Sequence, residues 1–116
     1  MAVKRNIRLT VNADNEFTFR WKDSTGIPYI LSDVVMTVKE NEATDDVIVE
    51  ASVDNGYVII DTDPDVAYAY IVIPKAALAG QTTKKAQYDI IATRQVDGRS
   101  LRIYEGDVVI SKGISA

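Results

Sequence analysis

The chain has 116 residues, of which 47% are hydrophobic and 26% are charged, so its composition fits one globular domain with a core of its own. Its formal net charge of −4 argues against nucleic acid or an anionic membrane surface as a partner. The chain has no cysteine and no histidine, which excludes disulfides and removes the commonest general base and transition-metal ligand. The sequence has neither a signal peptide nor an apolar stretch of roughly 18 residues, so we expect no Sec export and no membrane helix.

The N-terminal part of the chain predicts two β-strands. Residues 5–11 and 16–22 both alternate apolar with polar side chains, and the second segment carries its three aromatic residues on one face. We expect these two segments to pair with each other around a short turn. The N-terminal strand or arm within residues 1–15 is equally suited to pair with a neighbouring subunit, because an edge strand offers unpaired backbone groups.

A tight corner is expected after the second segment. Asp23 can cap a turn through its carboxylate, Gly26 can adopt a positive φ angle, and Pro28 fixes the chain as it leaves the corner. We expect Trp21 to bury most of its ring between two sheets, with its indole N–H at a carbonyl or at the solvent edge.

The middle of the chain predicts four more strands. Residues 33–40 and 47–53 alternate apolar with polar groups, and Asp54–Gly56 has the composition of a tight hairpin turn that leads into residues 57–61. Residues 66–73 are apolar on both faces and rich in tyrosine and β-branched side chains. This last run is typical of a central strand.

The C-terminal part predicts one helical turn and a long hairpin. Residues 75–79 are good helix formers between a proline and a glycine, which favours about one turn of helix. Residues 86–95 and 99–111 read as two strands joined at Asp97 and Gly98, the strongest hairpin signal in the chain.

These elements predict an all-β fold. Short strands with turns roughly every ten residues indicate an Ig-like antiparallel β-sandwich of about eight strands, with one short helical turn. Residues 1–116 form a single domain in this interpretation, since no change in composition marks a boundary. Gly106, inside the last strand, is expected to mark a bulge or a close approach of another backbone segment.

Carboxylates are the only plentiful reactive groups. Asp61, Asp63 and Asp65 stand at alternate positions and are weak candidates for a hard cation such as Ca²⁺, but a solvated turn is the favoured interpretation. Without histidine, no serine or threonine has the usual base beside it, and no nucleophile motif occurs. We therefore expect no enzyme activity and no cofactor.

The tyrosines allow two interpretations. Tyr68 and Tyr70 share one face of a predicted strand, while Tyr88 and Tyr104 lie on the C-terminal hairpin. Tyrosine is enriched at protein interfaces, so these side chains could form a contact patch. Packing in the core and at the rim of the sandwich is the favoured alternative.

Three segments taken together resemble a known family. They are "FRWKDSTGIPYILSDVVMTVKE", "YIVIPKAALAG" and "QYDIIATRQVDGRSLRIYEGDVVIS". Their order is similar to a β-sandwich domain of tailed-phage structural proteins, best known as the N-terminal domain of siphophage upper baseplate proteins. The matching positions are Trp21-Lys22-Asp23, Gly26, Pro28, Leu31, Pro74 to Gly80, Tyr88-Asp89-Ile90, Asp97-Gly98 and Gly106 to Ile110.

The resemblance implies a non-enzymatic virion structural protein of a bacteriophage, in a tail, baseplate, neck or capsid surface. Its partners would be other phage structural proteins, with a homo-oligomer compatible with that role, and it would be assembled in the host cytoplasm. The chain stops at Ala116, whereas the baseplate proteins continue into a linker and a docking region. We therefore expect a freestanding virion component, or one that decorates another protein.

Two other classes of function remain open. An Ig-like binding module would use loops around Asp23, Asp45 and Asp97 to grip a host glycan or receptor. A small hydrolase would need a cleft that holds a carboxylate of raised pKa.

Overall fold

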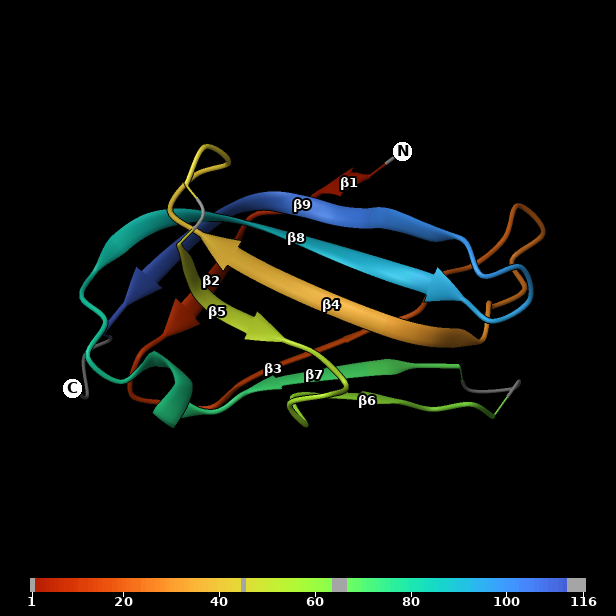
Figure 1. The fold of residues 1–116 in the computed structure, drawn as a ribbon, viewed down its shortest axis with the longest axis horizontal. Helices are drawn as coiled ribbons and strands as arrows, with labels where there is room; N and C mark the ends of the chain where they lie inside the picture. The colour runs from red at the N-terminus through yellow and green to blue at the C-terminus, as the bar shows by residue number, and fades with distance from the viewer. Residues whose placement is uncertain (1, 45, 64–66, 113–116) are drawn as a thin grey trace.

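The computed structural model describes residues 2–44, 46–63 and 67–112. In these ranges nine strands and one short 3-10 helix build two sheets that face each other (Figure 1). In chain order they are β1 (Val3–Lys4), β2 (Ile7–Thr10), β3 (Asn15–Phe19), β4 (Leu31–Lys39), β5 (Val47–Ala51), β6 (Val58–Ile60), β7 (Ala69–Ile73), the helix η1 (Lys75–Leu78), β8 (Lys84–Arg94) and β9 (Ser100–Ser111).

The sheet topology confirms an Ig-like sandwich. The larger sheet has the order β1-β9-β8-β4-β5, with β2 also paired to β9, and the smaller sheet has the order β3-β7-β6. This is the arrangement of an Ig domain whose G, F and C strands are joined by an additional C′ strand and face a B-E-D sheet. The prediction of a purely antiparallel fold was wrong in one respect, because β1 and β2 run parallel to β9.

The predicted pairing of the first two segments was also wrong. β2 belongs to the larger sheet and β3 to the smaller one, and residues 11–14 carry the chain across between them. The Asn15 side chain holds this crossing, because its amide accepts the Thr10 N–H at 3.0 Å and donates to the Thr10 carbonyl at 3.1 Å. The two strands face each other across the core, where Leu9 and Phe19 are buried. A period of two shows that a strand has an apolar face, but not whether its neighbour lies beside it or opposite it.

The Asp54–Gly56 segment forms a turn, but not a hairpin within one sheet. The Gly56 N–H donates to the Val53 carbonyl at 3.1 Å, as in a tight turn. The strands on either side lie in different sheets, with β5 beside β4 and β6 beside β7. The prediction of a central strand at residues 66–73 is confirmed for its described part, because β7 lies between β3 and β6.

The C-terminal predictions are confirmed. β8 and β9 form a long antiparallel pair, and Gly98 in their turn has a φ of +68°. The helical turn is the 3-10 helix η1, whose Leu78 is fully buried.

The core lies between the two sheets and receives side chains from both. Trp21 was predicted to lie inside it, but the ring is only half-buried and packs against the margin of the core. The largest fully buried side chains are those of Leu9, Val34, Met36, Val38, Ile71, Ile73, Leu78, Val108 and Ile110.

No helix in the described ranges is long and apolar enough to cross a membrane.

Gly106 marks a close backbone approach rather than a bulge. A Cβ at this position would lie 2.8 Å from the carbonyl carbon of Arg5 and closer still to its oxygen. The same Arg5 carbonyl accepts a hydrogen bond of 2.6 Å from the hydroxyl of Tyr88. Burial raises the pKa of that hydroxyl, which therefore keeps the proton that it donates. The irregularity in the β8–β9 ladder lies elsewhere, between Ile90 and Ile91.

We predict that Gly106→Ala destabilises the fold by about 1–3 kcal/mol, because backbone atoms of two strands must move apart to admit the new methyl group. The measurement is urea unfolding followed by far-UV circular dichroism. Asp107→Ala, at the exposed neighbouring position, is the control and should change stability by less than about 0.5 kcal/mol. Equal stability of Gly106→Ala and the wild type would contradict the tight contact.

Candidate protein contact surface

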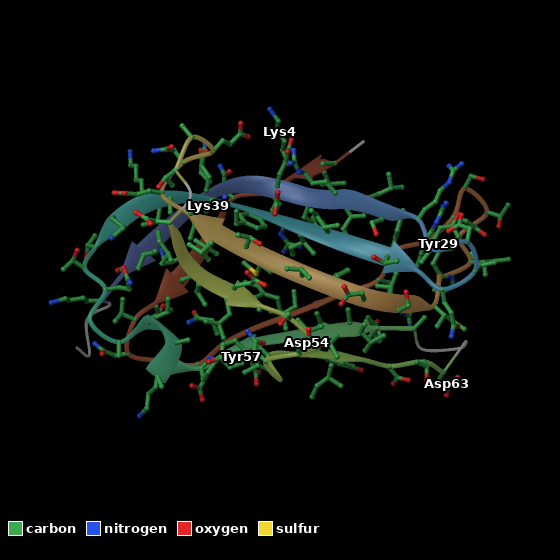
Figure 2. All side chains as sticks on the ribbon, viewed as in Figure 1. Lys4, Tyr29, Lys39, Asp54, Tyr57 and Asp63 are labelled. Atoms are coloured by element: carbon green, nitrogen blue, oxygen red, sulfur yellow. The ribbon has the colours of Figure 1, made fainter. Side chains whose placement is uncertain are left out.

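One end of the sandwich gathers much of what the sequence singled out. The segment between β3 and β4 and the turn between β8 and β9 both lie there, as does the end of the β6 strand (Figure 1). Figure 2 shows Tyr29 and Asp63 at this end, with Lys39 toward the other. We call residues 21–30 and 94–99 together the loop end.

The β3–β4 segment is a small hairpin rather than an open loop. An antiparallel bridge joins Lys22 to Pro28, and the Tyr29 N–H donates to the Trp21 carbonyl at 2.7 Å. These backbone pairs fix the segment as a hairpin that extends beyond the sheets.

Asp23 closes the tip of this hairpin, as predicted. Its Oδ1 accepts hydrogen bonds from the Thr25 N–H at 2.8 Å, the Thr25 hydroxyl at 2.7 Å and the Ile27 N–H at 3.0 Å. Gly26 has the expected positive φ of +86°. The hydrogen bonds from Thr25 and then Ile27 lower the pKa of the Asp23 carboxyl below its usual value, since they stabilise the charged form.

Arg94, at the end of β8, packs against this hairpin. Its guanidinium carbon lies 5.1 Å from the ring centre of Trp21 and 4.8 Å from that of Tyr29. The two rings are 5.2 Å apart and tilted by 59°. A cation over aromatic faces is attracted by their quadrupole, so one charge holds both rings.

Asp97 fixes Arg94 in that place. Both guanidinium and carboxylate take part in two hydrogen bonds, of which the one from Nε to Oδ1 measures 3.1 Å. The Arg99 N–H also donates to Asp97, and this backbone bond, followed by those from Arg94, lowers the pKa of the carboxyl. A backbone hydrogen bond of 2.9 Å from the Gln95 N–H to the Ile30 carbonyl also connects the hairpin to the β8–β9 turn.

The loop end presents apolar side chains to solvent. Ile27 is 63% exposed at the tip of the β3–β4 hairpin, and Val96 is 79% exposed at the tip of the β8–β9 turn. Both side chains stand on turns whose backbone is hydrogen-bonded, so a partner that covered the loop end would meet them first.

The four tyrosines divide between core and surface. Tyr88 is buried, and Tyr104 packs edge-on against Phe19 with ring centres 5.7 Å apart. Tyr68 and Tyr70 instead lie half-buried on the outer side of β7, since its alternate residues form the core. Arg20 covers the Tyr68 ring at 4.0 Å, and the two tyrosine rings are 6.0 Å apart. This pair therefore lies on the outer face of the smaller sheet, away from the core.

The candidate cation site has only two described members. Asp61 accepts the Asp63 N–H at 2.9 Å through its side chain, which is the geometry of a capped turn. Asp65 lies outside the described residues. Within the described ranges no group of three acidic, histidine or cysteine side chains is placed to hold a metal ion.

A shallow hollow of about 560 Å³ lies on the outer face of the larger sheet. Two of its carboxylates are paired, because Arg102 binds Asp89 at 3.1 Å and Glu105 at 3.4 Å. Glu42 and Asp107 also line the hollow.

The loops expected to grip a ligand do not all meet. Asp23 and Asp97 lie together at the loop end, but the segment after β4 is at the opposite end of the sandwich (Figure 1). Asp45 itself lies outside the described residues. The three-loop grip is therefore reduced to two loops.

Comparison with known proteins gives a structural likeness at low sequence identity. No protein-family model and no curated protein matches the chain. A solved structure of the NK cell receptor Nkp44, "a triggering partner in natural cytotoxicity", aligns over 96% of this chain and 99% of that one, with 10% identity and a TM-score of 0.49.

Sequence reasoning missed the residues that assemble the loop end. Arg94 follows a strand of ordinary composition, and Ile27 and Val96 look like two more apolar residues in an apolar-rich chain. One signal was available, since an apolar residue within a turn of polar residues is unexpected at a solvated tip. The role of Arg94 depends on a contact with residues far away in the sequence and leaves no local pattern.

We predict that the loop end makes stability depend on acid. The folded pKa values of Asp23 and Asp97 are lowered, so their contribution is present above about pH 4 and is lost as the pH falls through the folded values. The variant Asp23→Asn/Asp97→Asn should therefore have a lower melting temperature than the wild type at neutral pH, and a smaller decrease below about pH 4. Thermal unfolding by circular dichroism at fixed ionic strength measures both.

Asp54→Asn/Asp107→Asn, which changes two exposed carboxylates away from the loop end, is the matched control and should keep the wild-type pH dependence. Parallel pH curves for the wild type and the Asp23→Asn/Asp97→Asn variant would exclude this source of acid sensitivity.

Proposed function

We propose that this chain is a non-enzymatic structural protein of a bacteriophage virion that acts by binding other virion proteins through its loop end. The observation that carries the proposal is the gathering of separate motif segments into one braced surface. Trp21 comes from one part of the sequence and Asp97 from another, yet both contact Arg94. Asp23, Gly26 and Pro28 shape the hairpin that carries Trp21.

The chemistry of the loop end suits protein contact. Its backbone is fixed by bridges and side-chain caps, so little freedom remains to be lost when a partner binds. Ile27 and Val96 would enter apolar pockets of that partner, while Arg94 keeps the aromatic rings rigid behind them. The acidic net charge keeps the unassembled chain soluble.

The use of the reactive groups supports a non-enzymatic role. Asp23 and Asp97 serve as acceptors within their turns, and Asp89 and Glu105 neutralise Arg102. In the part of the chain that the structure describes, these carboxylates hold the fold rather than face an open reaction centre.

The virion assignment comes from the resemblance of the three sequence segments to tailed-phage β-sandwich domains. In the structure, parts of the first and third segments lie together at the loop end, whereas the second segment ends in η1, at the other end of the sandwich (Figure 1). Tail, baseplate, neck and capsid surface are all compatible sites, and the partners would be neighbouring virion proteins.

A binding module for a host glycan or receptor is the second candidate. It is favoured by the position of the loop end, which corresponds to the B–C and F–G loops that variable Ig domains use for binding. Against a sugar, the exposed aromatic surface is limited, since Arg94 already covers a face of both Trp21 and Tyr29.

We predict that Ile27→Asp/Val96→Asp folds normally but is incorporated into virus particles at least about tenfold less than the wild type, because charges replace two exposed apolar side chains that the partner would bury. The measurement is quantitative mass spectrometry of particles purified from the producing host. Val53→Asp, at a 44% exposed apolar position outside the loop end, is the control and should be incorporated normally.

Absence of the wild-type chain from purified particles would contradict the virion role. Specific binding of the purified chain to host glycans or to the host cell surface, lost in the Ile27→Asp/Val96→Asp variant, would then favour the second candidate.

A further inference from the structure

We propose that the outer edge of β9 accepts residues 2–11 from a second copy of this chain, so that neighbouring copies exchange these segments. We call residues 2–11 the arm. The inference rests on the proposed function as an assembly subunit and names one of its contacts.

The arm follows β9 in a single unbroken register. Val3 lies opposite Tyr104 and Thr10 opposite Ser111, and the offset is the same in β1 and β2. The Arg5 N–H also donates to the Glu105 carbonyl at 2.9 Å, between the two short strands. The arm is thus one long parallel strand with a local kink.

The kink is recognised through backbone atoms. The Tyr88 hydroxyl binds the Arg5 carbonyl at 2.6 Å, and Gly106 leaves room for that carbonyl to pass. The Asn6 side chain accepts the Asp107 N–H at 3.1 Å and so replaces the missing ladder bond. Since the same groups meet whichever copy supplies the arm, the site is equally complementary to an arm from a neighbour.

The arm is bound on one side only. Among the described residues it pairs with β9 alone, and β3 pairs only with β7. A hollow of about 380 Å³, lined by Ile7, Phe17 and Phe19 among others, lies between the arm and the smaller sheet. Removing the arm breaks this ladder and the core contacts of Leu9, and both would re-form on the neighbouring copy.

The connection between arm and β3 is short. Residues 11–14 must carry the chain from one sheet to the other, and exposed residues 12–14 form most of this link. It is held by side-chain bonds from Asn15 and by the Asp14 carboxylate, which accepts the Lys75 N–H at 2.8 Å. The link has few residues, and short hinges of this kind favour exchange between copies.

The occupant is specific because the edge reads an alternating strand. Leu9 must enter the core fully, Ile7 partly, and the carbonyl of the kink must reach Tyr88. Reciprocal exchange would give a two-fold dimer, and exchange in one direction around a circle would give a ring.

The test uses the absence of cysteine from the chain. Arg8 and Val109 are register partners with outward side chains, so cysteines at these positions can form a disulfide. Single variants Arg8→Cys and Val109→Cys are co-expressed with different tags, purified together through both tags and oxidised. If arms are exchanged, the mixed disulfide forms at least about tenfold more than in a control with Ile59→Cys in place of Arg8→Cys.

The solution mass of the wild type, measured by light scattering over a wide range of concentration, is the second readout. A dimer or ring together with the mixed disulfide supports exchange. A monomer at every concentration, or a double variant Arg8→Cys/Val109→Cys that closes only within one chain, overturns it. Normal particle incorporation with unexchanged arms would overturn this inference alone, whereas loss of incorporation with exchanged arms would concern only the proposed function.

Discussion

Each strand from β2 to β9 carries an apolar face that water disfavours, and the two sheets remove those faces from water by covering each other. The rest of the architecture follows from this constraint. Turns such as residues 52–57 and the crossing at residues 11–14 do not fold a strand back beside its predecessor; they move the chain to the opposite sheet. The ends of the strands are then left free of the core, and it is there that the chain can build surfaces without disturbing its packing.

The sequence predicts those features that local chemistry determines. Asp23 caps its turn and Gly26 takes a positive φ because both properties belong to the residue and its near neighbours. The same holds for the β8–β9 turn and the single turn of 3-10 helix. By contrast, alternation in residues 5–11 was compatible with several partners. The selection of β9 depends on Gly106, which leaves room for the Arg5 carbonyl, and on the Tyr88 hydroxyl, which donates to that carbonyl. Both residues lie far from Arg5 in the sequence, so no local pattern contains these contacts.

The candidate surface divides in the same way. Its acceptors and turn glycines could be identified from sequence, whereas its organising cation could not. Arg94 becomes important only when a hairpin formed before β4 and a turn formed after β8 are brought side by side, which is a property of the whole fold. Trp21 illustrates the difference: its size suggested the centre of the core, but its actual partners are a cation and a second ring at the margin.

The marginal place of Trp21 has an optical consequence. It is the only tryptophan in the chain, and it lies beneath a guanidinium at one tip of the molecule. Its emission therefore reports the local environment of that tip, while the amide signal in circular dichroism reports both sheets. Any partner that covers the tip would change the tryptophan spectrum without changing the amide signal, so the chain carries its own fluorescent label for the surface through which we expect it to act.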